Sequence, residues 1–142
     1  MPREKLPKER PSITRRFKIT YVDDNNQAHV LRFYAVAGMY DDSRIAEVFF
    51  FTDRKHGEGS KLISLLSGTL EAVGTAISIG LQHGAPLESF TTKLRNNQFG
   101  PSGFTGDGQF PSCTSMFDLA AQWLIATFPN GKYAGGFHLT CR

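Results

Sequence analysis

The most constraining feature of this sequence is a change in the spacing of its apolar residues near residue 55. Before that point, ITRRFKITYV (13–22) alternates apolar and polar side chains, which is the period of a half-buried strand. Two further runs, HVLRFYAVA (29–37) and IAEVFFFT (45–52), are rich in aromatic and β-branched residues and are separated by turn residues. Strands joined by short turns favour an antiparallel meander with one buried face.

After the change, residues 59–84 have the pattern of one long helix. Ser60 suits an N-cap, and Gly84 followed by Pro86 suits the end of a helix. About 24 residues correspond to roughly 36 Å, which is longer than such a small body needs. The apolar positions recur every three or four residues and are Leu62, Leu66, Leu70, Val73, Ile77 and Leu81.

The opposite face of this helix carries small or polar residues. Small side chains let another backbone come close, so we predict that the helix over residues 60–84 packs against its copy across a dimer axis. Higher even oligomers are compatible with the same closed symmetry. A solvated face composed of poor helix formers is the alternative. The residues of this face are Ser64, Gly68, Glu71, Thr75, Ser78 and Gln82.

Two shorter helices are predicted further along the chain, over residues 86–96 and 115–128. The first begins at a proline, and the second has one apolar side and stops before Pro129. The predicted fold class is therefore α+β, with an N-terminal antiparallel three-stranded meander followed by a long helix and two shorter helices. We expect one domain over residues 12–142, ending in a short strand within 132–142. It would be preceded by an extended, mobile, basic arm over residues 1–11.

The length and the cysteine content exclude several classes of protein. A chain of 142 residues suffices for one core and is too short for two. No apolar run has the length of a membrane span, and residues 1–11 lack the apolar segment of a signal peptide. Cys113 and Cys141 are far apart and form no CxxC motif, which is typical of neither a zinc site nor a disulfide framework. We therefore expect a cytoplasmic protein, in the host cytoplasm if a phage encodes it.

The basic charge is concentrated at the N-terminus. Residues 1–18 contain seven basic and two acidic side chains, whereas the remaining chain contains nine basic and eleven acidic ones. A face that binds duplex nucleic acid normally clusters its cations on the folded surface. Nucleic-acid binding is therefore not the expected function, and the arm would carry it if it occurs.

Motifs of known enzymes are missing from the sequence. GEGSKLIS places glycines before a lysine and a helix but lacks the order of a phosphate-binding P-loop. Acidic pairs fall in predicted turns, where aspartate is common for backbone reasons. We expect no catalytic residues, no metal site, no cofactor and no enzymatic activity. The four histidines, which show no ligand spacing, are His29, His56, His83 and His138.

The segment LQHGAPLESFTTKLRNNQFGPSGFTGDG (81–108) is the candidate binding site. Its glycines let backbone N–H groups approach a ligand, its rings can stack on a base, and its polar side chains can hold a phosphate. A structural loop whose aromatic residues fill the core is the alternative. The candidate residues are Gln82, Arg95, Asn97, Phe99, Ser102, Gly103, Phe104 and Thr105.

Within this set we assign Arg95 as the main cation, because a guanidinium can hold a phosphate through two parallel hydrogen bonds. Phe99 or Phe104 would stack on a base. The Arg95→Ala substitution is then expected to weaken binding with little loss of folding stability.

Several of these motifs resemble one known family. AEVFFF (46–51), GS (59–60) opening the long helix, and TAISIGLQHGAPLESFTTKLRNNQFGPSGFTGD (75–107) resemble the TSCPD-type domain at the C-terminal end of adenosylcobalamin-dependent (class II) ribonucleotide reductases. The likeness covers about residues 13–128 and implies the fold and a history in nucleotide metabolism. The radical-generating barrel, the catalytic cysteines and the cobalamin site of those enzymes belong to other domains. The resemblance therefore does not imply reductase activity.

Three functions are compatible with these features. The first is non-catalytic sequestration of a nucleotide-derived small molecule, such as a cyclic nucleotide or ADP-ribose-type immune signal. It is similar in size and logic to the phage anti-Thoeris and anti-CBASS sponges. The second is an accessory or regulatory role for a ribonucleotide reductase. The third is a nucleic-acid adaptor that acts through the basic arm.

Overall fold

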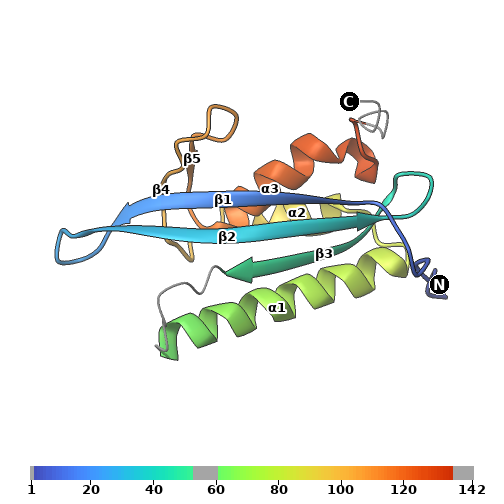
Figure 1. The fold of residues 1–142 in the computed structure, drawn as a ribbon, viewed down its shortest axis with the longest axis horizontal. Coiled ribbons are helices and arrows are strands. Elements are labelled where there is room, and N and C mark those ends of the chain that lie inside the picture. Colours follow the sequence, from blue (N-terminus) through green and yellow to red (C-terminus); the bar gives the residue numbers. More distant parts are fainter. Residues whose placement is uncertain (1, 53–60, 136–142) are drawn as a thin grey trace.

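A computed structural model describes residues 2–52 and 61–135 of the chain. It has the predicted α+β architecture, with the three-stranded meander preceding the helices (Figure 1). The expected N-cap at Ser60 and the end of the chain from residue 136, with Cys141 and most of the expected final strand, lie outside the described residues. The elements are β1 (Ser12–Val22), β2 (Ala28–Met39), β3 (Ile45–Thr52), α1 (Lys61–Gln82), α2 (Glu88–Leu94), β4 (Gly103–Phe104), β5 (Ser112–Cys113), α3 (Met116–Thr127) and the 3-10 helix η1 (Pro129–Gly131).

The strands form one antiparallel sheet in the order β3-β2-β1-β4-β5. The register of β1 and β2 places Phe17 opposite Phe33, and that of β2 and β3 places Tyr34 opposite Phe51. The meander is as predicted, but β4 and β5 come from the stretch between the predicted helices over 86–96 and 115–128, where no strand was expected. Two-residue strands are too short to show an alternating pattern, so periodicity could not reveal them.

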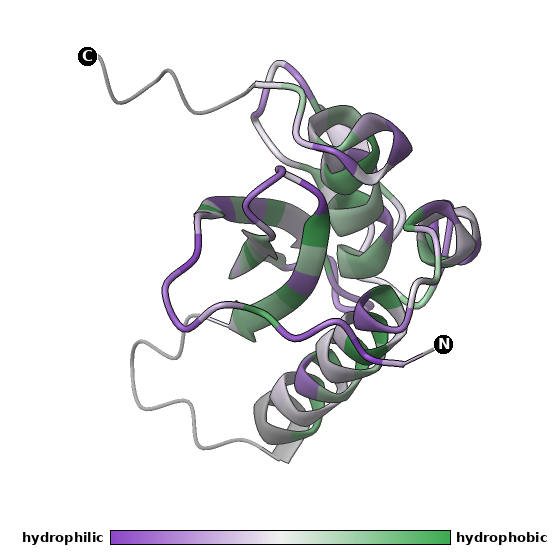
Figure 2. Ribbon diagram, turned by 90° about the vertical axis from the view of Figure 1, so that its right-hand side faces the viewer, coloured by the Kyte–Doolittle hydropathy of each residue, from purple (hydrophilic) through white to green (hydrophobic). Residues whose placement is uncertain are grey.

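The helices lie on one side of the curved sheet (Figure 2). The inward residues of β1 and of the middle of β2 alternate with more exposed ones, whereas the end of β2 and the start of β3 are buried continuously. The buried residues of the three strands meet the apolar faces of α1 and α3 in one core. The alternation in β1 is the period-two pattern of the sequence, and burial of its apolar side against the helices stabilises the fold. Fully buried side chains of this core include Ile19, Phe33, Met39, Val48, Leu70, Met116, Leu119, Leu124 and Phe128.

Helix α1 lies alongside the edge strand β3 (Figure 1). A side chain at Gly74 would place its Cβ only 2.9 Å from the carbonyl oxygen of Val48. The backbone N–H of Val48 donates to the Ser78 hydroxyl at 2.9 Å, which satisfies a polar group of the strand. The small residues at the C-terminal part of α1 therefore let the helix cover a sheet edge that would otherwise be open to pairing.

The helix face that the sequence predicts for dimerisation is therefore partly buried within its own chain and partly exposed. Ser78 and Gln82 are buried in their own chain, whereas Gly68, Glu71 and Thr75 are exposed. An added Cβ at Gly68 would meet no atom within 4 Å. The exposed part of the face remains the candidate contact with a second copy.

Replacing Gly68 with leucine tests this contact. If two copies pack closely along the exposed part of α1, the leucine separates them, and light scattering should show the molar mass falling to that of one chain. The thermal midpoint of the monomer should not fall, because the substituted position is open in one chain. A wild-type protein that is monomeric at micromolar concentration would contradict the predicted assembly.

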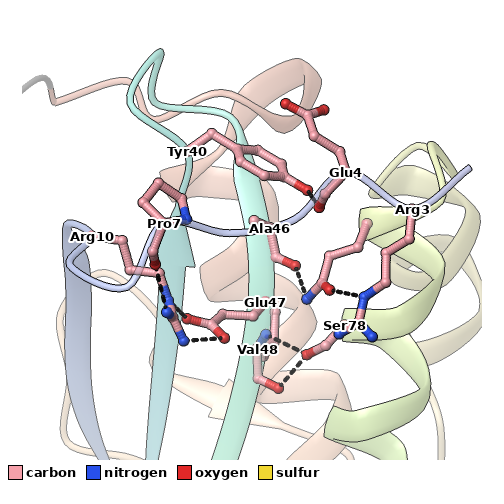
Figure 3. Close-up of polar contacts among 10 residues, drawn as sticks. Arg3, Glu4, Pro7, Arg10, Tyr40, Ala46, Glu47, Val48 and Ser78 are labelled. Atoms are coloured by element: carbon pink, nitrogen blue, oxygen red, sulfur yellow. Dashed lines mark hydrogen bonds and ion pairs between the residues drawn. The ribbon is translucent and has the colours of Figure 1, made fainter.

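Residues 2–11 lie against the rest of the domain (Figure 3). The Arg3 side chain donates from Nε to Gln82 Oε1 at 2.6 Å, and the Glu4 N–H donates to the Gln82 carbonyl oxygen at 2.8 Å. The Tyr40 hydroxyl donates to the Glu4 carbonyl oxygen at 2.7 Å. We expected an extended, mobile arm; in the structure the segment is held by contacts with α1 and with the end of β2. Composition could not reveal these long-range partners.

The Arg10 guanidinium anchors this segment to β3. It donates from Nε to Glu47 Oε2 at 2.5 Å and from Nη2 to Oε1 at 3.1 Å, which gives a two-point contact. The Glu47 side chain is 9% exposed, so it has little water to replace this partner.

We expect Arg10→Ala to lower the free energy of unfolding by about 1–3 kcal/mol, the usual cost of leaving a buried polar group without its partner. Lys8→Ala, at an exposed position of the same segment, is the matched control and should have little effect. Urea denaturation measures both. Equal stability of the two variants would show that the Arg10 contact does not stabilise the domain.

Candidate ligand-binding site

The residues predicted for the binding site lie in three places. Gln82 is buried at the end of α1, where its side-chain amide donates to the Ala46 carbonyl oxygen at 3.1 Å and accepts from Arg3. Both ends of the amide are therefore engaged within the chain, and the residue joins α1, β3 and the N-terminal segment. The structure does not bring it together with the glycine-rich loop.

Arg95, Asn97 and Phe99 form the second group, next to the N-terminus of α3. Arg95 donates from Nη1 to Asp118 Oδ1 at 2.5 Å, and the Phe99 N–H donates to Asn97 Oδ1 at 3.0 Å. The Phe99 ring is 70% exposed and lies 6.4 Å from the ring of Phe117, centroid to centroid.

Asp118 organises this second group, and the sequence reasoning missed it. Its buried carboxylate accepts from the backbone N–H groups of Asn96 (2.7 Å) and Thr114 (3.0 Å) and from the Gln122 side chain (3.1 Å). Burial raises the pKa of this carboxyl, but the two backbone donors and Arg95 outweigh burial, so the pKa lies below its ordinary value. The signal was the spacing of Ser115 and Asp118, which is the start of a capping box ahead of an apolar helix.

This ion pair changes the expectation for Arg95. Its side chain is 41% exposed, so a phosphate can reach it, but one of its nitrogens already binds Asp118. We now expect Arg95→Ala to cost about 1 kcal/mol of stability, the upper value for a partly exposed pair. Thermal denaturation without ligand measures this cost. An unchanged midpoint would instead agree with the sequence-based expectation that Arg95→Ala causes little loss of folding stability.

Gly103, Phe104 and Thr105 form the third group, at the edge of β1. A Cβ on Gly103 would overlap the carbonyl oxygen of Thr20, so only glycine permits this close approach of β4 to β1. Phe104 pairs with Thr20 and is 74% exposed. Thr105 is buried, and its hydroxyl donates to the Phe110 carbonyl oxygen at 2.5 Å. The exposed Ser102 precedes β4.

A cavity of about 300 Å³ opens beside this third group. It lies between the turn 105–107 and the side of the sheet that faces away from the helices. Three of its lining residues are cations of β1 and β2 that the sequence reasoning did not select. The lining residues are Arg16, Phe17, Lys18, Arg32, Thr105, Gly106 and Asp107.

Arg15 holds the turn that closes the cavity. Its guanidinium forms an ion pair with Asp107 and lies 5.5 Å from the ring centroid of Phe17 and 5.6 Å from that of Phe110. This cation therefore neutralises Asp107, the one carboxylate among the described residues that line the cavity. The charged groups that remain in the lining are the cations Arg16, Lys18 and Arg32. Such a lining is suited to binding an anion.

Other chemical features of the described residues are few. Within residues 2–52 and 61–135, no three His, Cys, Asp or Glu side chains gather as a metal site would require. Cys113 is buried, and burial raises the pKa of its thiol. No helix in the described part of the chain has the length and apolar character needed to cross a membrane.

Comparisons with known proteins give matches that extend over most of the chain. The family model described as TSCPD domain matches residues 4–128. The vitamin B12-dependent ribonucleotide reductase of Rhodopirellula baltica is 34% identical over 130 residues, which is 92% of this chain and 11% of that protein. Those of Streptantibioticus cattleyicolor and Bradyrhizobium diazoefficiens are 33% and 28% identical over 89% of this chain, and they are covered over 18% and 9% of their own lengths.

The chain thus spans between about a tenth and a fifth of these relatives. No solved structure shows a significant match. The family match begins at residue 4 and therefore includes most of the N-terminal segment that contacts Gln82 and Glu47. On this evidence the chain belongs to the TSCPD domain family, as its sequence motifs predicted.

Proposed function

We propose that this chain acts as a non-catalytic accessory or regulatory protein of a vitamin B12-dependent ribonucleotide reductase. The observation that supports this proposal is the match of residues 4–128 to the TSCPD domain together with similarity to several such reductases over about nine tenths of the chain. Most of the length of those proteins has no counterpart in the chain. We therefore propose a role in binding or regulation rather than in the reduction itself.

A direct binding experiment tests this proposal. The chain would be mixed with the vitamin B12-dependent ribonucleotide reductase of Streptomyces coelicolor, which is 33% identical to it over 126 residues. One sample would contain the full-length enzyme and the other the enzyme without its matching region. The resident domain is tethered and so has a high effective concentration. We therefore expect the free chain to bind the shortened enzyme more tightly.

Sedimentation velocity would measure the complex, and a reductase assay would measure the change in rate. The control is the destabilised variant Asp118→Ala, measured at a temperature at which that variant is unfolded and the wild type is folded. No complex with either form at tens of micromolar would contradict the proposal.

Binding of a nucleotide-derived small molecule is the second candidate function. The observation that favours it is the cavity with three cations at the end of the glycine-rich loop. Mass spectrometry of the protein purified from cells and then denatured would reveal a bound nucleotide. Recovery of that ligand unaltered would agree with sequestration, whereas a hydrolysed product would contradict it.

The nucleic-acid adaptor stays a third and weaker hypothesis. Arg3 and Arg10 in the N-terminal segment already bind Gln82 and Glu47, which leaves fewer cations there for phosphates. A steeply salt-dependent affinity for DNA that disappears when residues 2–10 are removed would favour it.

A further inference from the structure

Three cations, Arg16, Lys18 and Arg32, lie close together on one side of the sheet and line the same cavity. The strand register places Lys18 of β1 directly opposite Arg32 of β2. Arg16 lies two residues before Lys18 on β1 and therefore on the same face of the sheet. Like charges directly opposite each other on an antiparallel pair are destabilising. None of the three has an ion-pair partner among the residues that the structure describes. The fold therefore tolerates a repulsion that a bound anion would relieve.

Among residues 2–52 and 61–135, the cavity lining offers these cations no free carboxylate. Asp107 is the acidic residue of the cavity lining, and it is held by Arg15 on the other side of the turn. Thr105 directs its hydroxyl to the Phe110 carbonyl oxygen and so closes the turn rather than neutralising charge. The cavity therefore keeps the positive charge of Arg16, Lys18 and Arg32.

Aromatic rings flank the cations on the same side of the sheet. Tyr34 is the cross-strand partner of Arg16, and Phe51 continues this row on β3. On the other flank, Phe104 is the partner of Thr20, two residues from Lys18. Phe51 is 54% exposed, and Phe104 is more exposed still. Cations next to accessible rings suit a ligand that carries both phosphate and a flat base.

We propose that this cavity binds a nucleoside phosphate. Arg16, Lys18 and Arg32 hold the phosphate groups, and the ring of Phe104 stacks on the base. The volume of about 300 Å³ lies at the lower end of the range for small-molecule sites. The site does not depend on the proposed partnership with a reductase. It provides the second candidate function with a location that differs from the sequence-based assignment of Arg95.

Calorimetry on the purified full chain tests the proposal with five probes: ATP, AMP, adenosine, inorganic pyrophosphate and a twelve-residue oligothymidylate. We expect affinity to rise with the number of phosphates, from adenosine without measurable binding to ATP as the tightest. Pyrophosphate should bind more weakly than ATP because it has no base. Binding of the oligonucleotide alone would overturn the proposal in favour of single-stranded nucleic acid.

Variants locate the ligand. Lys18→Gln and Arg32→Gln should each weaken ATP binding about tenfold or more, the effect of losing one charge-assisted hydrogen bond. Lys93→Gln, at an exposed lysine of α2, is the matched control and should leave the affinity unchanged. Phe104→Leu should weaken ATP without weakening pyrophosphate.

Thermal denaturation without ligand separates this role from a structural one. The midpoint of Lys18→Gln or Arg32→Gln should stay constant or rise, because each substitution removes repulsion between neighbouring cations. A fall in the midpoint would assign these residues to folding. No binding of any phosphate-bearing probe at millimolar concentration, or equal binding by the wild type and both glutamine variants, would overturn the proposal. None of these results depends on a reductase, so the two proposals fail independently.

Discussion

The Asp118→Ala substitution is expected to lower the free energy of unfolding by about 3 kcal/mol. Its carboxylate is 2% exposed and accepts from the backbone N–H groups of Asn96 and Thr114. Alanine would leave those donors, the Gln122 amide and the Arg95 guanidinium without their common acceptor. The segment before α3 would lose its attachment to the helix. Urea denaturation followed by circular dichroism measures the loss.

The same carboxylate also predicts a dependence on pH. Its pKa is lowered in the folded state, so its stabilising effect is fully present above the unfolded value of about 3.9 and is lost as the pH falls through the folded pKa. Asp118→Ala should therefore flatten the acid limb of the stability profile below about pH 4. Asp24→Asn, in the exposed turn between β1 and β2, is the matched control. Identical acid limbs for the wild type and Asp118→Ala would contradict this account.

The Gly103→Ala substitution is expected to have the second large effect. Its methyl group would overlap the carbonyl oxygen of Thr20, which belongs to the backbone of β1 and cannot turn aside. β4 would then move away from β1, at a cost of about 1–3 kcal/mol, as for other overpacked positions. The turn 105–107 is continuous with β4, so the cavity would lose one wall. We expect both the stability and the affinity for ATP to fall.

Gly108→Ala is the matched control in the same loop. No atom lies within 4 Å of the Cβ that would be added there, and its backbone is not in the left-handed region. Hydrogen exchange of the residues around β4 would show whether the strand detaches in Gly103→Ala and stays in place in Gly108→Ala. Equal protection in the two variants would show that the close approach at Thr20 is not required.

Regular periodicity made most of the fold predictable. The alternation of Phe17 and Ile19 with charged neighbours located β1, and the spacing of Leu70 and Ile77 located the buried side of α1. The expected helix over residues 115–128 differs by one residue at each end from α3, where Ser115 acts as the N-cap. These patterns are local, because each depends only on which face of a single element is apolar.

The candidate site was predicted only in part, since its parts are remote in the sequence. Arg95 was selected as a free cation, but its partner Asp118 lies 23 residues further along the chain. Lys18 and Arg32 each look like ordinary surface cations until the register of β1 and β2 places them face to face. The residue pattern of a single strand does not reveal which residues of a neighbouring strand will lie opposite it.

Taken alone, the sequence therefore determined the order of the three long strands and the three helices, the apolar sides of β1, α1 and α3, and the family to which the chain belongs. Only the tertiary structure decided that Ser78 and Gln82 lie against β3, that Arg10 holds the N-terminal segment on Glu47, and that three cations share one cavity. The physical reason is that apolar burial follows local periodicity. Polar partners are instead chosen by distance and direction in the folded chain, which no local pattern records.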